Sequence, residues 1–186
     1  MSEQGNSSKY GTFYGVGVGP GDPELLTVKA SKLLQRVPVI CARQTEPERG
    51  NYALDVVQGL LDEARQEVLR FSLPADGSMG TVQAWQSAAE AIGERLRRGQ
   101  DVAFITEGDP MLYSTFSHLL ERVLSVEPGV PVEVIPGVSS VMAAAASSGV
   151  PLVTHGQRLA ILPAVYGIDD LREAITNYDT IVLMEV

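Results

Sequence analysis

The stretch Gly15-Val-Gly-Val-Gly-Pro-Gly-Asp-Pro-Glu-Leu-Leu26 decides how the first part of this chain folds. It begins inside an apolar run of strand length, residues 12–18, and leads into a segment of helical period, residues 24–36. Glycine lets the backbone turn sharply and approach a ligand without an intervening side chain. Asp22 suits a helix N-cap and Pro23 suits the first helical position. The stretch therefore predicts a strand, a tight loop and a helix, in that order.

The glycine spacing in this loop excludes a dinucleotide-binding fingerprint. That fingerprint places glycines at its first, third and sixth positions. Counted from Gly15 the sixth position is Pro20, and counted from Gly17 it is Asp22, whose charge would repel a pyrophosphate. No Lys-Ser or Lys-Thr pair follows, so the stretch is not a phosphate-binding P-loop either.

The alternation of short apolar runs and segments of helical period continues along the chain. Further strands are predicted at residues 37–42, 67–70, 101–106, 130–135, 159–162 and 180–186, and further helices at residues 52–64, 80–98, 112–125, 139–148 and 169–177. Such alternation predicts an α/β fold with a mainly parallel sheet. In the longest helix, apolar residues at helical spacing predict a face that packs in the core. They are Val82, Trp85, Ala89, Ile92 and Leu96, so Trp85 is predicted to be a core residue and not a ligand contact.

The composition narrows the class of partner. The chain has 14 Lys and Arg against 23 Asp and Glu, a formal net charge of −9. This balance argues against nucleic acid or an anionic membrane surface as a partner, because either would need a basic face. A small polyanionic substrate stays possible, since a few local arginines can outweigh the overall sign. Cys41, the single cysteine, lies in an apolar run and is predicted to be a buried strand thiol, and no metal site is predicted.

The domain organisation follows from where the patterns change. Residues 1–9 are polar, carry no apolar signal segment, and are predicted to form a disordered arm. An N-terminal α/β lobe is expected over residues 10–150 and a C-terminal α/β lobe over residues 151–186. The second lobe contains one helix and two strands and ends inside an apolar strand, so we expect it to be incomplete. No apolar stretch is long enough to span a bilayer, and a cytoplasmic protein is expected.

A second loop repeats the chemistry of the first. The stretch Ile105-Thr-Glu-Gly-Asp-Pro-Met-Leu-Tyr113 also leaves a predicted strand, with Asp109 as the expected helix cap and Pro110 behind it. In open parallel sheets, ligands bind beyond the carboxyl ends of the strands, where both loops are expected. Their acidic caps favour a cationic or hydroxyl-bearing ligand over a phosphate, and a sulfonium nucleoside fits that description.

A third stretch of small residues follows the strand predicted at residues 130–135. It reads Pro136-Gly-Val-Ser-Ser140 and continues into an alanine-rich helix. Small side chains permit close approach of either a flat ligand or a neighbouring helix. Ser139 and Ser140, at the start of the helix, are placed to offer hydroxyl or amide contacts.

Taken in this order, the three motifs, with Val182-Leu-Met184, resemble those of the tetrapyrrole methylase family. Residues 14–27 and 106–116 resemble its precorrin-2 C(20)-methyltransferase branch, including the cobalt-factor II version. The resemblance covers residues 11–186 and implies two α/β lobes, a homodimer, and S-adenosyl-L-methionine bound between the lobes, with S-adenosyl-L-homocysteine as product. It assigns cofactor contacts to eight residues: Pro20, Glu107, Gly108, Asp109, Leu112, Ser139, Ser140 and Met184.

The expected reaction is methylation of C-20 of precorrin-2 or cobalt-factor II in corrin biosynthesis. Arg43 stands where uroporphyrinogen methylases of the family carry an acidic residue, and Arg43 and Arg49 are predicted to bind substrate carboxylates. No catalytic residue is assigned, although Glu107, Asp109 and His155 are candidates for accepting the departing proton. Because the family continues beyond the strand of Met184, the chain resembles a fragment. The alternatives are a methylase of the same scaffold for another acceptor (another precorrin, uroporphyrinogen, RNA or protein) and a truncated module that binds the cofactor without turnover.

Overall fold

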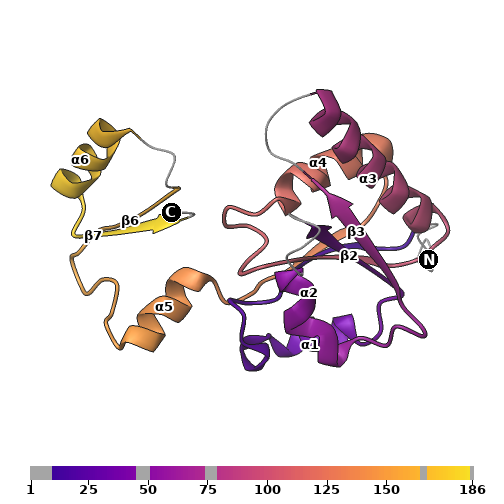
Figure 1. Cartoon of the computed structure of the whole chain (residues 1–186), viewed down its shortest axis with the longest axis horizontal. Coiled ribbons are helices and arrows are strands. Elements are labelled where there is room, and N and C mark those ends of the chain that lie inside the picture. Colours follow the sequence, from indigo (N-terminus) through magenta and orange to yellow (C-terminus); the bar gives the residue numbers. More distant parts are fainter. Residues whose placement is uncertain (1–9, 45–50, 74–78, 164–166, 185–186) are drawn as a thin grey trace, which may run out of the picture. The chain divides into compact units, whose positions relative to one another are not determined.

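A computed structural model describes residues 10–44, 51–73, 79–163 and 167–184 of the chain (Figure 1). The chain divides into two compact units, residues 1–139 and 140–186. The boundary that the sequence placed near residue 151 lies inside the second unit. The predicted arm, residues 1–9, lies outside the described residues.

The first unit is built on a five-stranded parallel sheet. The strands lie in the order β3-β2-β4-β1-β5. Their bounds are β1 (Phe13–Gly17), β2 (Val39–Gln44), β3 (Glu67–Ser72), β4 (Val102–Thr106) and β5 (Val132–Ile135). All five were predicted from apolar runs, and the predicted α/β class is confirmed. Gly17 lies opposite Thr106, and Val16 lies opposite Ile135. The carboxyl ends of β4, β1 and β5 therefore lie side by side.

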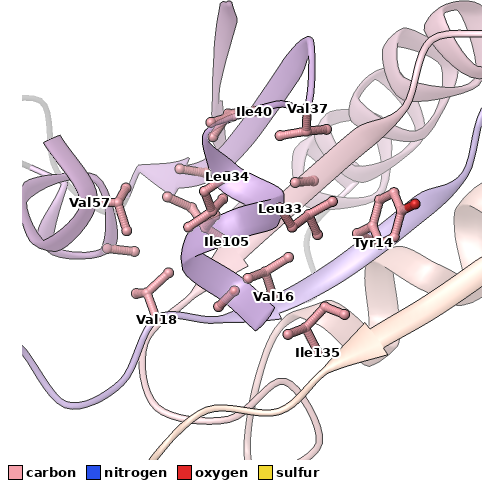
Figure 2. Packing of buried hydrophobic residues seen from close by; sticks show 14 of the residues in the cluster. Tyr14, Val16, Val18, Leu33, Leu34, Val37, Ile40, Val57, Ile105 and Ile135 are labelled. Atoms are coloured by element: carbon pink, nitrogen blue, oxygen red, sulfur yellow. The ribbon is translucent and has the colours of Figure 1, made fainter. Parts of the chain in front are cut away.

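Four α-helices cover the two faces of this sheet. They are α1 (Val28–Leu34), α2 (Tyr52–Val57), α3 (Met79–Arg97) and α4 (Phe116–Val126), with short 3₁₀ helices η1 (Pro23–Leu25) and η2 (Gln58–Leu60). Side chains of α1 and α2 share one buried cluster with the sheet, and those of α3 and α4 share another. Figure 2 shows the first cluster, in which Leu33 and Leu34 of α1 lie among side chains of four strands: Val16, Ile40, Ile105 and Ile135.

Strand residues alternate between the two clusters, as the two-residue period of a strand requires. In β4, Val102 and Phe104 belong to the cluster of α3 and α4, whereas Ala103 and Ile105 belong to that of α1 and α2. Every residue of β1, and the first four residues of β2 and of β4, are buried. The sheet is therefore a rigid platform whose carboxyl edge can hold loops in fixed positions.

The structure shows whether two groups of predicted core residues are buried, one in α3 and one in β2. Trp85, Ala89, Ile92 and Leu96 are buried as predicted, but Val82 is 48% exposed. The prediction was wrong for Val82 because the buried face at this end of α3 passes through Thr81, one residue earlier. Cys41 is fully buried in β2, and its burial raises the pKa of the thiol.

The second unit contains α5 (Ser140–Ser148), β6 (Leu159–Pro163), α6 (Ile168–Asn177) and β7 (Thr180–Met184). β6 and β7 pair in parallel, with α6 as the connection between them. The Asp179 carboxylate accepts from the backbone N–H of Arg158 at 2.8 Å, and the Thr180 hydroxyl donates to the carbonyl of Leu152 at 2.6 Å. Across both units, none of the helices in the described ranges is long and apolar enough to cross a membrane.

Candidate functional site

Three loops leave the carboxyl ends of β4, β1 and β5, which are neighbours in the sheet. They are residues 18–27 after β1, residues 107–115 after β4 and residues 136–139 after β5. All three belong to the first unit. Ligands of open parallel sheets bind at this edge, which makes the three loops the candidate site.

The two Gly-Asp-Pro loops adopt the same turn. The Asp22 carboxylate accepts from the N–H of Glu24 at 2.9 Å, and the Asp109 carboxylate accepts from the N–H of Met111 at 2.8 Å. In both loops the aspartate carbonyl also accepts from the N–H three residues later, that of Leu25 at 3.0 Å and that of Leu112 at 3.3 Å. The likeness that the sequence suggested is therefore a likeness of backbone conformation.

The sequence predicted that Asp22 and Asp109 each cap a helix. In the structure, neither aspartate caps a long helix. Asp22 caps only η1, and α1 begins at Val28 with the Thr27 hydroxyl accepting from the N–H of Ala30 at 3.2 Å. Asp109 opens an isolated turn, and α4 begins seven residues later at Phe116. The predicted helix starts at residues 24 and 112 were too early, because one Asp-Pro turn satisfies its own amides without continuing into an α-helix.

Glycines let the backbones of the three loops touch. The N–H of Gly108 donates to the carbonyl of Gly19 at 2.8 Å, and the N–H of Gly19 donates back at 3.3 Å. A Cβ atom placed on Gly17 would lie 2.5 Å from the carbonyl oxygen of Gly108, and one placed on Gly137 would lie 2.1 Å from it. The Gly108 carbonyl thus occupies the space that side chains at Gly17 and Gly137 would fill.

A side chain adds a second connection between the loops. The other carboxylate oxygen of Asp109 accepts from the N–H of Gly137 at 2.9 Å. The Thr27 hydroxyl lies 3.4 Å from the carbonyl oxygen of Pro136 and donates to it. The loop after β5 is therefore joined to the loop after β4 and to the start of α1.

The first loop is also held by α2. The Tyr52 phenol donates to the carbonyl oxygen of Pro20 at 2.9 Å. A Cβ atom on Gly21, whose φ is 127°, would lie 2.1 Å from the same phenol oxygen. Gly21 therefore leaves room for Tyr52 to reach the backbone of the loop.

The chemistry of these loops fits a cation better than a phosphate. Their sequences contain no lysine, arginine or histidine but four acidic residues: Asp22, Glu24, Glu107 and Asp109. The Glu107 side chain is exposed at the edge of the sheet. Backbone carbonyls, carboxylates and hydroxyls suit the sulfonium, amino and ribose hydroxyl groups of S-adenosylmethionine. The residues present thus fit the cofactor that the sequence indicated.

The structure brings together six of the eight predicted cofactor contacts on the first unit: Pro20, Glu107, Gly108, Asp109, Leu112 and Ser139. Ser140 begins α5 and Met184 ends β7, and both belong to the second unit. His155, one of the proton-acceptor candidates, lies exposed in a turn of the second unit.

Of the two arginines predicted to bind substrate, Arg43 lies within the described residues. Arg43 lies half-buried near the end of β2, and its Nε donates to the carbonyl oxygen of Leu73 at 3.0 Å. Its own carbonyl accepts from the Asn51 amide at 2.7 Å, and the Asn51 side chain also caps α2. The guanidinium is thus held by Nε next to the end of β3. Arg49 lies outside the described residues.

Sequence reasoning missed Tyr52 and Gly137 as parts of the site. Tyr52 is 52% exposed and was assigned only to a helix, because nothing in its own neighbourhood indicates that its phenol reaches Pro20. Gly137 was noted only within a run of small residues. The Pro-Gly pair directly after a strand was the available signal, since an unencumbered glycine at that edge permits close backbone approach.

Comparison with known proteins assigns the family. Residues 12–186 match the family model described as Tetrapyrrole (Corrin/Porphyrin) Methylases. A probable cobalt-precorrin-2 C(20)-methyltransferase of Methanocaldococcus jannaschii is 38% identical over 172 residues, which are 92% of this chain and 71% of the relative. A precorrin-2 C(20)-methyltransferase of Sinorhizobium sp is 35% identical over 184 residues, 95% of this chain and 74% of the relative.

One of the similar solved structures contains bound S-adenosylhomocysteine. The uroporphyrin-III C-methyltransferase of Thermus thermophilus, crystallised with S-adenosylhomocysteine, has a TM-score of 0.59 to this chain and is 30% identical. The match covers 84% of this chain and 57% of that one. The family match, together with the fold and the joined loops, shows that this chain belongs to the tetrapyrrole methylase family.

Proposed function

We propose that this chain is an S-adenosylmethionine-dependent methyltransferase that acts on C-20 of precorrin-2 or of cobalt-factor II in cobalamin biosynthesis. The relatives named precorrin-2 C(20)-methyltransferase and probable cobalt-precorrin-2 C(20)-methyltransferase are 35% and 38% identical over more than nine-tenths of the chain. The observation that carries the proposal is the joining of three glycine-containing loops, two of them acidic, at one edge of the sheet. These three loops contain no lysine, arginine or histidine that would favour an anionic ligand.

The cofactor contacts proposed are those of the family motifs. Pro20, Glu107, Gly108, Asp109, Leu112 and Ser139 would hold the cofactor from the first unit, and Ser140 and Met184 from the second. When bound, S-adenosylmethionine supplies a methyl group already activated by its sulfonium sulfur. The main work left to the protein is alignment, which contributes up to ~7–11 kcal/mol in favourable cases. Loops fixed by backbone contacts suit that task, because they need no rearrangement before the reaction.

The acceptor side is proposed to include Arg43 and Arg49. The acceptor is a reduced tetrapyrrole with many carboxylates, and its meso carbon is electron-rich enough to attack without a strong base. The Nε of Arg43 is engaged with Leu73, so its terminal nitrogens are the atoms to bind a carboxylate. Glu107 and His155 are the proposed candidates for receiving the departing proton; in Asp109, both carboxylate oxygens already accept backbone hydrogen bonds.

Assembly and location follow the family proposal. We propose a homodimer, which the resemblance implies, and sedimentation velocity would measure it. A cytoplasmic location is proposed on the same ground.

An absorbance assay tests the function. The chain, incubated with S-adenosylmethionine and either precorrin-2 or cobalt-factor II, should change the spectrum of one of them, and mass spectrometry should find one added methyl group. The acceptor that reacts identifies the branch. Binding of S-adenosylhomocysteine in a calorimeter without turnover of either acceptor would instead support a cofactor-binding module. Absence of both would contradict the proposal.

A further inference from the structure

We infer that Asp109 is a positioning residue: its carboxylate holds two cofactor loops together and does not itself contact S-adenosylmethionine. The inference rests on the proposed function and changes the role of Asp109 within it. The resemblance places Asp109 among the cofactor contacts, whereas the geometry gives its side chain another task.

Each oxygen of the Asp109 carboxylate accepts a hydrogen bond from a backbone amide. One oxygen accepts from the N–H of Met111 at 2.8 Å, within its own loop. The other accepts from the N–H of Gly137 at 2.9 Å, in the loop after β5. Hydrogen bonds to a charged acceptor are about twice as strong as neutral ones. Asp109 therefore contributes to the site through the loops that it joins.

Asp22 shows which of the two hydrogen bonds is special. It forms the same turn with the N–H of Glu24 at 2.9 Å, but its side chain is exposed. Within the described residues, no bond joins the second oxygen of Asp22 to another loop. The turn alone therefore needs one carboxylate oxygen, and the second oxygen of Asp109 is an addition that serves the contact with Gly137.

The hydrogen bond to Gly137 fixes more than one amide. The carbonyl oxygen of Gly108 lies where Cβ atoms of Gly17 and Gly137 would stand, at 2.5 and 2.1 Å. Any movement of Gly137 away from Asp109 would open this contact and remove one of the two neighbours of the Gly108 carbonyl oxygen, which the N–H of Gly19 would still hold. Residues 107–109 present their backbone at the proposed cofactor site, so loss of the clamp would misplace that backbone.

Asp109→Asn isolates the second oxygen. The amide side chain offers one oxygen to two N–H groups. When that oxygen keeps the turn with Met111, the NH₂ group faces the N–H of Gly137 and two donors meet. The matched control is Asp62→Asn. Asp62 forms a comparable turn in the loop before β3, accepting from the N–H of Ala64 at 3.1 Å, and its carboxylate also pairs with Arg65. Among the described residues, no hydrogen bond or ion pair joins it to the three loops.

The first measurement follows the Gly137 amide itself in the unliganded chain. Hydrogen exchange recorded by NMR should accelerate at Gly137 by roughly tenfold or more in Asp109→Asn, because the amide loses its charged acceptor. The exchange rate of Gly137 should stay unchanged in Asp62→Asn. Equal Gly137 rates in parent and Asp109→Asn would overturn the clamp.

The second measurement is calorimetric titration of the same proteins. S-adenosylhomocysteine should bind Asp109→Asn roughly tenfold more weakly than the parent, the equivalent of losing one hydrogen bond to a charged group. Affinity for the tetrapyrrole should be unchanged, and Asp62→Asn should match the parent for both ligands. This split between the two ligands is not expected from general loss of structure.

The outcomes separate the competing roles. Weaker cofactor binding with an unchanged Gly137 exchange rate would mean that the carboxylate contacts the cofactor directly, which overturns the inference. Faster exchange with unchanged cofactor affinity would overturn the positioning role. If the parent chain bound no S-adenosylhomocysteine, the proposed function and the positioning role would both fail, and the exchange rate would still decide whether the clamp exists.

Discussion

The phenol of Tyr52 donates a hydrogen bond to the carbonyl oxygen of Pro20 over 2.9 Å, although 32 residues separate them in the chain. This contact joins the first turn of α2 to the loop after β1. The residue just before it, Asn51, binds the carbonyl of Arg43 at 2.7 Å. The start of α2 therefore contacts both the proposed cofactor loop and the strand end that carries the proposed substrate arginine.

Tyr52→Phe should weaken binding of S-adenosylhomocysteine by a few-fold, because a solvent-accessible hydrogen bond of this kind contributes about 0.5–1.5 kcal/mol. Calorimetric titration measures the change. Tyr14→Phe is the matched control, since it also removes a phenol oxygen but one with no hydrogen bond among the described residues, and it should bind like the parent. Identical affinities for both variants would show that Tyr52 does not hold the loop.

Gly137→Ala should disrupt the junction of the loops. Its methyl group would stand 2.1 Å from the carbonyl oxygen of Gly108, which is backbone and cannot move aside without shifting a loop. We expect unfolding free energy to fall by about 1–3 kcal/mol, as in other overpacked sites. Cofactor affinity should fall with it. Urea denaturation and calorimetric titration measure the two quantities.

Gly59→Ala provides the comparison for that substitution. A Cβ atom on Gly59, in η2, would meet nothing within 4 Å. The alanine should leave stability unchanged or raise it by about 0.4–1 kcal/mol, because it reduces the freedom of the unfolded chain. Equal losses in the two variants would contradict a special role for the Gly108–Gly137 contact.

Arg43→Ala should weaken tetrapyrrole binding and spare the cofactor. A charge-assisted hydrogen bond contributes about 1.5–3 kcal/mol, which corresponds to a roughly ten- to hundredfold loss of affinity. Arg43→Lys should recover only part of it, since lysine lacks the planar fork. Titrations with the tetrapyrrole and with S-adenosylhomocysteine, run on these variants and on the exposed-arginine control Arg65→Ala, measure the effect. Tetrapyrrole affinity equal to that of the parent would exclude Arg43 from the substrate site.

The ion pair between Glu67 of β3 and Arg95 of α3 should make stability depend on acid pH. The guanidinium donates from Nη2 at 2.6 Å and from Nε at 3.2 Å, and these hydrogen bonds lower the pKa of Glu67. Because the folded pKa lies below the unfolded value of about 4.3, the stabilisation is present above that value and is lost as pH falls through the folded pKa.

Glu67→Gln should therefore be less stable than the parent near neutral pH and approach it in acid. The difference should be about 0.2–1 kcal/mol, because the Glu67 side chain is 43% exposed and water screens the pair. Urea denaturation across the acid range measures it. Glu63→Gln, an exposed carboxylate without an ion pair among the described residues, should follow the parent curve. Parallel curves for Glu67→Gln and the parent would contradict this pairing.

The strands could be predicted from the sequence because each is a short apolar run bounded by turn residues. The predicted run of residues 101–106 and the observed β4, Val102–Thr106, differ by one residue. A fully buried parallel strand needs apolar side chains on both faces, so its signal is local. Helix starts were harder at residues 24 and 112, because an Asp-Pro turn carries the same residues whether or not a helix follows it.

The candidate site was predicted as a set of loops but not as a set of contacts. Asp109 and Gly137 lie 28 residues apart, and neither residue's local sequence indicates that they share a hydrogen bond. The contact arises because β4 and β5 both flank β1, which is a property of strand order. Periodicity predicts strands without predicting their order, so this part of the site needed the structure.

The meeting of Gly17, Gly108 and Gly137 involves main-chain atoms only. No side chain in it can change rotamer to make room for a substitution at a neighbouring residue. The side chain of Met111, which is 67% exposed nearby, takes no part in this meeting of main-chain atoms. For protein engineering, variants that seek new acceptors should therefore keep these three glycines and change exposed side chains around them.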